Sequence, residues 1–123
     1  MIRAFLLVGL GGFFGSIARY GISHIINKYI TNPFPYATFI VNILGCFLIG
    51  LLFGLGQRSS WMEDQGWLIL ATGFCGAFTT FSTFALENNA LINEQRTITS
   101  ILYIATSVAI GLLLCRWGMN LMK

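Results

Sequence analysis

Four long runs without a charged residue constrain this chain more than any other feature of its sequence. They cover residues 4–18, 29–57, 65–86 and 97–115. A helix that crosses the apolar core of a bilayer needs about 20 mostly apolar residues, each adding about 1.5 Å. The last three runs reach or nearly reach this length, and apolar residues extend the first run past Arg19 to Ile26. The sequence therefore predicts an all-α membrane protein with four transmembrane helices, at about residues 2–26, 36–56, 67–93 and 97–120.

The low charge of the chain supports the same conclusion. Only 9% of the residues are charged and 56% are hydrophobic, whereas soluble domains carry about 25% charged residues. The first apolar stretch is long and lacks a small-residue cleavage site, so we expect a retained helix and not a signal peptide. Because no repeat or linker divides the chain, we expect one integral, multi-pass domain over residues 1–123.

The reactive and basic residues favour neither an enzyme nor a nucleic-acid-binding protein. There is one histidine, and the seven basic residues are scattered along the chain. Cys46, Cys75 and Cys115 lie within apolar runs without metal-type spacing, so we expect free thiols that pack as small apolar groups. The glycine-rich residues 9–15 do not match a dinucleotide fingerprint and follow no strand.

The distribution of Lys and Arg gives almost no preferred orientation in the membrane. Arg3, Arg58, Arg116 and Lys123 fall on the side shared by the two termini, and Arg19, Lys28 and Arg96 fall on the other. Positive charge normally sets topology. Two interpretations remain: a single, weakly biased orientation, or dual topology, in which copies insert both ways and pair antiparallel.

Three pairs of small residues suggest close helix packing. Gly11 and Gly15, Gly50 and Gly54, and Gly73 and Ala77 are each four residues apart, a spacing that lets helices approach in membranes. Some pairs must pack helices within one chain. Their number still suggests an oligomer, most simply a dimer.

Residues 73–84 are the most unusual part of the third predicted helix. They contain two glycines, three threonines, one serine and four phenylalanines in an uncharged segment. Gly, Ser and Thr weaken helices, and irregular backbone at membrane depth is tolerated only inside protein or beside a polar cavity. Broken helices commonly mark ion sites in transporters. The segment therefore favours a transport protein.

Asn42 is the most polar residue of the second predicted helix. Its amide offers two N–H donors to an anion, and Thr38 lies four residues earlier on the same helix face. The alternative is an interhelical hydrogen bond worth about 1 kcal/mol.

The fourth predicted helix carries a stripe of small and polar residues. Ser100, Tyr103, Ser107 and Gly111 recur at spacings of three and four, so they share one face. Such a stripe can line an ion path, but serine hydroxyls also bond back to their own helix.

Phe81 and Phe84 are three residues apart and enclose Ser82 and Thr83. Aromatic rings have positive edges that can face an anion weakly, although aromatic pairs in membranes usually only pack. Arg19 and Glu87 are ionisable residues near membrane depth and thus functional candidates. We place them in a vestibule, where an arginine would concentrate anions; the alternative is that both extend to the aqueous interface.

Three segments resemble the signatures of the Fluc (CrcB) fluoride channels, and the similarity extends over the whole chain. They are Gly-Gly-Phe-Phe-Gly-Ser-Ile-Ala-Arg-Tyr at residues 11–20, Thr-Phe-Ile-Val-Asn-Ile-Leu-Gly at 38–45, and residues 73–84, which end in Thr-Thr-Phe-Ser-Thr-Phe. The resemblance implies an antiparallel, dual-topology homodimer in the lipid of a prokaryotic plasma membrane. It also implies two pores through which fluoride leaves the cell passively, which relieves its toxicity.

The resemblance also implies roles for individual residues. A structural sodium ion at the dimer centre would be held by the backbone carbonyls of Gly76 and Thr79. The fluoride pore would be lined by Phe81 and Phe84, by the amide of Asn42, and by Thr38, Ser82, Thr83, Tyr103 and Ser107. Two departures from the family pattern are Ala77, where a second glycine is common, and Gly111, where a hydroxyl is expected.

Two other functions remain open. A small dual-topology drug exporter would also have four helices, but such exporters generally use an acidic residue in the first helix. This chain has no acidic residue before Glu63. A non-conducting scaffold would use its polar residues only to join helices.

Overall fold

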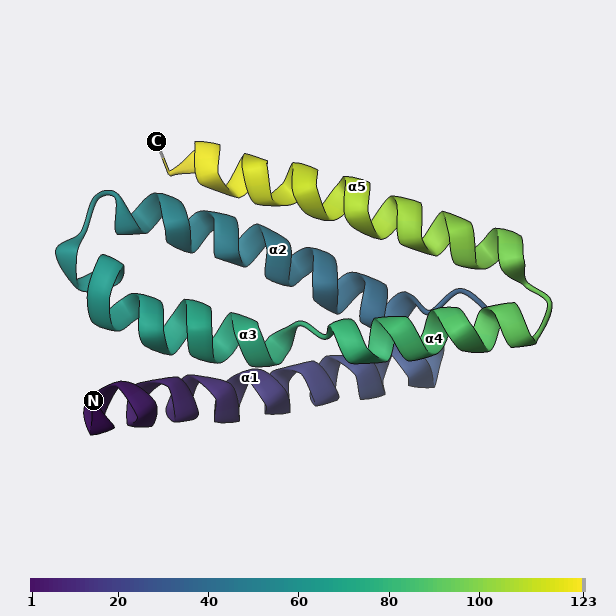
Figure 1. Ribbon diagram of the computed structural model, residues 1–123, viewed down its shortest axis with the longest axis horizontal. Coiled ribbons are helices and arrows are strands. Elements are labelled where there is room, and N and C mark those ends of the chain that lie inside the picture. Colours follow the sequence, from purple (N-terminus) through teal and green to yellow (C-terminus); the bar gives the residue numbers. More distant parts are fainter. Residues whose placement is uncertain (123) are drawn as a thin grey trace.

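The computed structural model describes residues 1–122, and Lys123, one of the basic residues counted above, lies outside the described residues. The elements are α1 (Ile2–Tyr29), α2 (Tyr36–Gly56), η1 (Met62–Cys75), α3 (Gly76–Phe78), α4 (Phe81–Asn93) and α5 (Thr97–Leu121) (Figure 1). Segments η1, α3 and α4 together form one span, Met62–Asn93. The described residues thus contain four helices long and apolar enough to cross a membrane, which confirms the predicted all-α fold.

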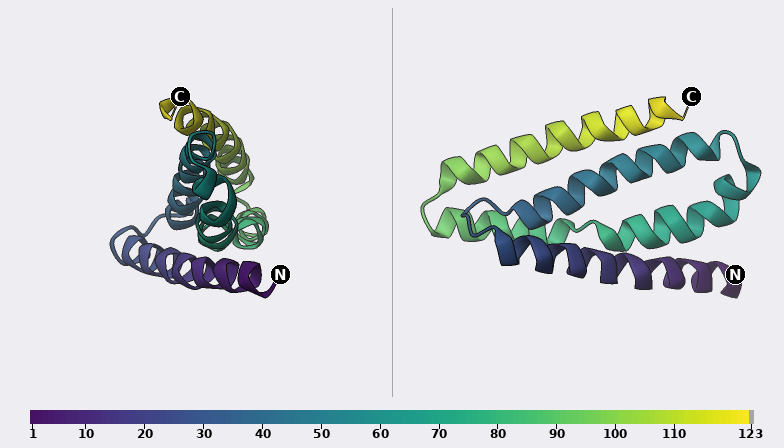
Figure 2. Two further views of the ribbon diagram at one scale, coloured as in Figure 1. Left: turned by 90° about the vertical axis from the view of Figure 1, so that its left-hand side faces the viewer. Right: turned by 180° about the vertical axis from the view of Figure 1, so that it is seen from behind.

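The four spans run antiparallel to their neighbours in sequence. The chain begins and α5 ends at the same end of the molecule, as an even number of spans requires (Figures 1 and 2). α2 packs mainly against α5, and α1 packs mainly against η1. In the end-on view, α1 lies at the opposite edge of the bundle from α5 (Figure 2).

The third span begins at Met62 rather than at residue 67. Glu63 and Asp64 lie in the first turn of η1, where acidic side chains interact favourably with the helix dipole. These charges precede the predicted helix at residues 67–93, and in the structure they stabilise the start of the span. η1 is π-helical, and the amide N–H of Gly76 donates to the carbonyl of Ala71, five residues earlier.

The predicted small-residue pairs pack helices inside the single chain. A Cβ on Gly11 or Gly15 would collide with backbone carbonyls of η1, and a Cβ on Gly50 would collide with the backbone of α5. A Cβ on Gly73 would lie 2.7 Å from the carbonyl oxygen of Val8. These pairs therefore pack helices within one chain, and the dimer that their number suggests stays a prediction.

Much of the apolar surface of the spans faces outward. Between 11% and 22% of the residues in the most apolar windows of the spans are buried. Phe5 is 70% exposed and Leu112 is 69% exposed. Soluble proteins rarely expose so much contiguous apolar surface, so these faces are suited to lipid or to another apolar protein surface.

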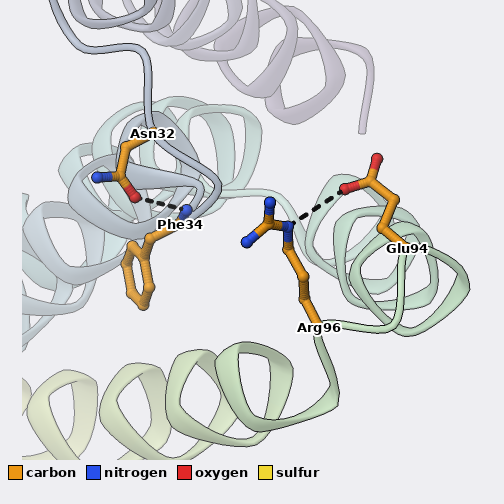
Figure 3. A network of polar contacts seen from close by, with 4 residues as sticks. All are labelled: Asn32, Phe34, Glu94 and Arg96. Atoms are coloured by element: carbon orange, nitrogen blue, oxygen red, sulfur yellow. Dashed lines mark hydrogen bonds and ion pairs between the residues drawn. The ribbon is translucent and has the colours of Figure 1, made fainter.

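Short polar contacts close the connections at the end opposite the termini (Figure 3). The side chain of Asn32 accepts a hydrogen bond of 3.0 Å from the amide of Phe34, and Arg96 pairs with Glu94 at 3.9 Å. After α4, Gln95 adopts a positive φ of 60°, and the amide of Arg96 donates to the carbonyl of Leu91. This Schellman-type ending stops α4 and reverses the chain.

Candidate functional site

The predicted break in the third span lies at Thr79 and Thr80, between α3 and α4 (Figure 1). Both residues have extended backbone conformations. The side chain of Asn42 on α2 pairs with both backbone groups of Thr80. Its Oδ1 accepts from the Thr80 amide at 2.8 Å, and its Nδ2 donates to the Thr80 carbonyl at 3.1 Å.

A second side chain contacts the same break from α1. The Nε of Arg19 donates a hydrogen bond of 3.0 Å to the carbonyl of Ala77. The half-buried Arg19 therefore turns inward, and its predicted role in a vestibule remains a prediction. The methyl group of Ala77 lies 3.9 Å from a Cβ built on Gly12, so this departure from the family pattern places its methyl toward α1.

Three carbonyl groups at the break have no hydrogen-bond donor among the described residues. They belong to Gly76, Phe78 and Thr79. Carbonyl oxygens are ligands that hard cations accept. Two of the three are the carbonyls predicted to bind sodium, so the donor set present here fits such an ion.

Thr80 also caps the N-terminus of α4. Its Oγ1 accepts from the amide of Thr83 at 3.3 Å and donates to the hydroxyl of Thr83 at 3.1 Å. The hydroxyl of Ser82 lies 3.4 Å from the same oxygen. Such caps satisfy free amides in the first turn of a helix. Ser82 and Thr83, which we predicted in the pore, are thus gathered at this helix start.

A pocket of about 400 Å³ opens beside the break. Four of the predicted pore residues line it, namely Asn42, Phe81, Phe84 and Ser107, and so do Thr79, Thr80, Gly45, Cys46, Ile49, Cys75 and Val108. The hydroxyl of Ser107 is buried and has no hydrogen-bond partner among the described residues. An unpaired buried hydroxyl costs free energy, so the pocket contains an unused polar group.

Aromatic rings extend from this pocket toward α5. The ring centroids of Phe81 and Phe84 are 5.9 Å apart, and those of Phe84 and Tyr103 are 4.9 Å apart. Phe81 is 79% exposed in the single chain. The pocket is therefore bordered on one side by a ring that faces outward.

Glu87 lies between α2 and α5. Its carboxylate accepts hydrogen bonds of 2.9 Å from the hydroxyl of Thr38 and of 2.9 Å from the hydroxyl of Tyr103. Thr38 and Tyr103 are both buried. The structure thus places two predicted pore residues against a predicted vestibule residue, and none of the three borders the pocket.

The predicted stripe on the fourth span faces the interior. Ser100, Tyr103 and Gly111 are buried on α5. A Cβ on Gly111 would lie 3.2 Å from the sulfur of Cys46, so this glycine allows α5 to approach α2. The stripe therefore serves helix packing at Gly111 and polar contact at Ser100 and Tyr103.

Thr80 was missed as a site residue in the sequence. It is the backbone partner of Asn42, the cap of α4 and part of the pocket lining. A threonine before a helix start is a capping signal, which could have identified it. Cys46 and Cys75 also line the pocket, and nothing in their spacing indicated this position.

Comparison with known proteins gives a consistent result over the whole chain. Residues 6–119 match the family described as "CrcB-like protein, Camphor Resistance (CrcB)". The chain is 46% identical to the fluoride-specific ion channel FluC 2 of Bacillus thuringiensis subsp. konkukian, over 98% of each protein. It is 47% identical to FluC 2 of Bacillus cereus strain ATCC 14579, over 98% of each, and 40% identical to FluC of Flavobacterium psychrophilum, over 99% of this chain and 98% of the relative.

Proposed function

Because this chain belongs to the CrcB family of ion channels, we propose that it is a fluoride-selective channel of the bacterial plasma membrane. It is a multi-pass membrane protein, and fluoride is its permeant ion. Passive export of fluoride through the channel relieves fluoride toxicity. The whole chain, residues 1–123, acts as one channel domain without enzymatic activity.

The observation that carries the proposal is the pocket beside the helix break. Its lining combines the amide of Asn42, the unpaired hydroxyl of Ser107 and the rings of Phe81 and Phe84. Fluoride is small and strongly hydrated, so a pore must supply hydrogen-bond donors in place of water. The described lining residues carry no charged group, which supports conduction because binding must be weak enough for the ion to leave.

The other predicted pore residues make polar contacts outside the lining of the pocket. The hydroxyls of Thr38 and Tyr103 donate to the carboxylate of Glu87. Ser82 and Thr83 add hydroxyls at the start of α4. We assign these residues to the fluoride path as well. Arg19 and Glu87 keep their proposed assignment to the approaches of this path.

A structural sodium ion fits the free carbonyls at the break. The carbonyls of Gly76 and Thr79 would hold it, and a bound cation would neutralise their partial negative charge. Gly76 is exposed in the single chain, so a second copy could place its own carbonyls against the same ion. The ion would therefore stabilise an antiparallel dimer, which the nearly balanced charges at the two ends permit.

The two alternative functions have less support. For an exporter of cationic drugs, the described part of α1 provides no acidic side chain. For a scaffold, the unpaired Ser107 hydroxyl has no use. The relatives described above are named as fluoride channels, and none of these names supports either alternative.

The proposal is tested by ion efflux from liposomes that contain the purified protein. We expect rapid fluoride efflux and no chloride efflux, measured with ion-selective electrodes. Protein-free liposomes control for leak. Folded protein in sodium-containing buffer that releases no fluoride would contradict the proposal, and chloride efflux at a similar rate would contradict the selectivity.

A further inference from the structure

The helix break is held from two sides by side chains of other spans. Asn42 on α2 pairs with Thr80, and Arg19 on α1 pairs with Ala77. Phe78 and Thr79 lie between the two contacts. These bonds connect residues 38 and 58 positions apart in sequence, so the packing of three spans fixes the local backbone.

Each contact replaces a bond that a continuous helix would make. In an α-helix, the amide of Thr80 would donate to the carbonyl of Gly76, and the carbonyl of Ala77 would accept from the amide of Phe81. Here the Thr80 amide donates to Asn42 and the Ala77 carbonyl accepts from Arg19. The carbonyl of Gly76 is left without its helical donor.

We infer that Asn42 and Arg19 are positioning residues that keep the third span broken, so that the carbonyl of Gly76 stays free for a cation. The meaning of this inference for transport rests on the proposed function. The role of Asn42 and Arg19 in the break does not rest on the proposed function, because the geometry of the break can be measured without sodium or fluoride.

The double pairing also fixes the orientation of the Asn42 amide. Its Oδ1 must face the Thr80 amide and its Nδ2 must face the Thr80 carbonyl, since a flipped amide would oppose like groups. One N–H of Nδ2 is used, and the other makes no hydrogen bond among the described residues. Because Asn42 also lines the pocket, one side chain contacts both the helix break and the proposed fluoride path.

The decisive variant is Asn42→Leu, which keeps the volume of the side chain and removes both polar atoms. We expect the helix to close, with the Thr80 amide within about 3.2 Å of the Gly76 carbonyl in an experimental structure of the variant. A break that keeps its present geometry in this variant would overturn the inference, whatever the transport activity.

Sodium-dependent thermal stability supplies a second readout. We expect Asn42→Leu to raise the sodium concentration at half-maximal stabilisation at least about tenfold, because the competing helical bond occupies a ligand. Asn42→Asp keeps the acceptor for the Thr80 amide but places a second oxygen against the Thr80 carbonyl, so it should restore only part of the sodium response. Ser107→Ala is the matched control: it changes the same pocket and removes no hydrogen bond to the break, so its sodium response should be unchanged.

Arg19→Met tests the other side of the break independently if Asn42→Leu does not fold. It should also raise the required sodium concentration, and Arg19→Lys, which keeps a donor, should restore part of the response. Equal sodium responses in folded wild type, Asn42→Leu and Arg19→Met would overturn the inference. If wild type itself shows no sodium response, the sodium part of the proposed function fails, and the structure of Asn42→Leu decides the inference alone.

Discussion

The hydroxyl of Ser100 on α5 donates a hydrogen bond of 2.8 Å to the side-chain oxygen of Asn88 on α4, and both residues are buried. The amide nitrogen of Asn88 in turn donates to the carbonyl of Phe84 at 2.9 Å. This chain of bonds joins α5 to the helix that carries the proposed pore phenylalanines. Ser100 and Asn88 do not line the pocket, so their contribution to stability can be separated from transport.

Ser100→Ala should lower the free energy of unfolding by about 1 kcal/mol, because it leaves the buried oxygen of Asn88 unpaired. Fluoride flux per folded protein should remain near wild type. Thermal unfolding in detergent and liposome efflux measure the two effects. Thr106→Ala is a suitable control, since Thr106 bonds only to carbonyls of its own helix. Normal stability together with lost flux in Ser100→Ala would place Ser100 in the ion path.

Phe81→Ile should reduce fluoride flux at least about tenfold, which corresponds to about 1.4 kcal/mol in the barrier. Because Phe81 is 79% exposed in the single chain, the change should cost little stability of the fold. Phe84→Ile should have a similar effect on flux. Phe5→Ile changes an exposed phenylalanine of α1 that does not border the pocket, and it should conduct normally. Normal flux in both Phe81→Ile and Phe84→Ile would remove these rings from the pore.

Thr79→Ala should leave the sodium response and most of the flux intact. The hydroxyl of Thr79 donates to the carbonyl of Cys75 at 3.0 Å, and this bond holds it toward its own helix, whereas we expect the backbone carbonyl to bind the ion. The measurements are sodium-dependent thermal stability and fluoride efflux, with Thr79→Ser as the variant that keeps the hydroxyl. A large loss in Thr79→Ala that Thr79→Ser restores would mean that the hydroxyl itself is used.

Gly118→Ala should destabilise the protein by about 2 kcal/mol through overpacking. A Cβ at this position would lie 2.6 Å from the carbonyl oxygen of Phe47 and 2.9 Å from the amide nitrogen of Leu51, so α5 would have to move away from α2. Gly9→Ala is the matched control, because nothing lies within 4 Å of its added Cβ. The control should keep or slightly gain stability. Equal melting temperatures for the two variants would contradict this account of the α2–α5 contact.

A dimer with two separate pores predicts the behaviour of mixed subunits. A dimer of one Phe81→Ile subunit and one wild-type subunit, co-expressed with two different affinity tags and purified through both, should retain about half of the wild-type flux if each pore conducts independently. Single-channel recording of this mixed dimer checks the expectation, with a doubly tagged wild-type dimer as the control. Complete loss of flux would indicate that both subunits contribute Phe81 to each pore.

The positions of the four spans and of the break were largely predictable from sequence. Length and the absence of charge decide which residues can cross a bilayer, and the concentration of Gly, Ser and Thr at residues 73–84 identified the weak point of the third helix. The start of the third span differs for a local reason, because the first turn of η1 includes Glu63 and Asp64, which precede the predicted helix at residues 67–93. The glycine pairs contact neighbouring helices of the same chain, and the dimer stays a prediction.

The sequence by itself determined that this chain is a membrane protein and which polar residues are available within its spans, because these properties depend on local composition and helix length. Only the tertiary structure decided how those residues are paired. Asn42 was expected to face an anion, but most of its amide is bonded to Thr80, and Glu87 is bonded between Thr38 and Tyr103. These pairings depend on the rotation and closeness of packed helices, which glycines at the α1–η1 and α2–α5 contacts set. Such relations join residues far apart in sequence, so no local pattern specifies them.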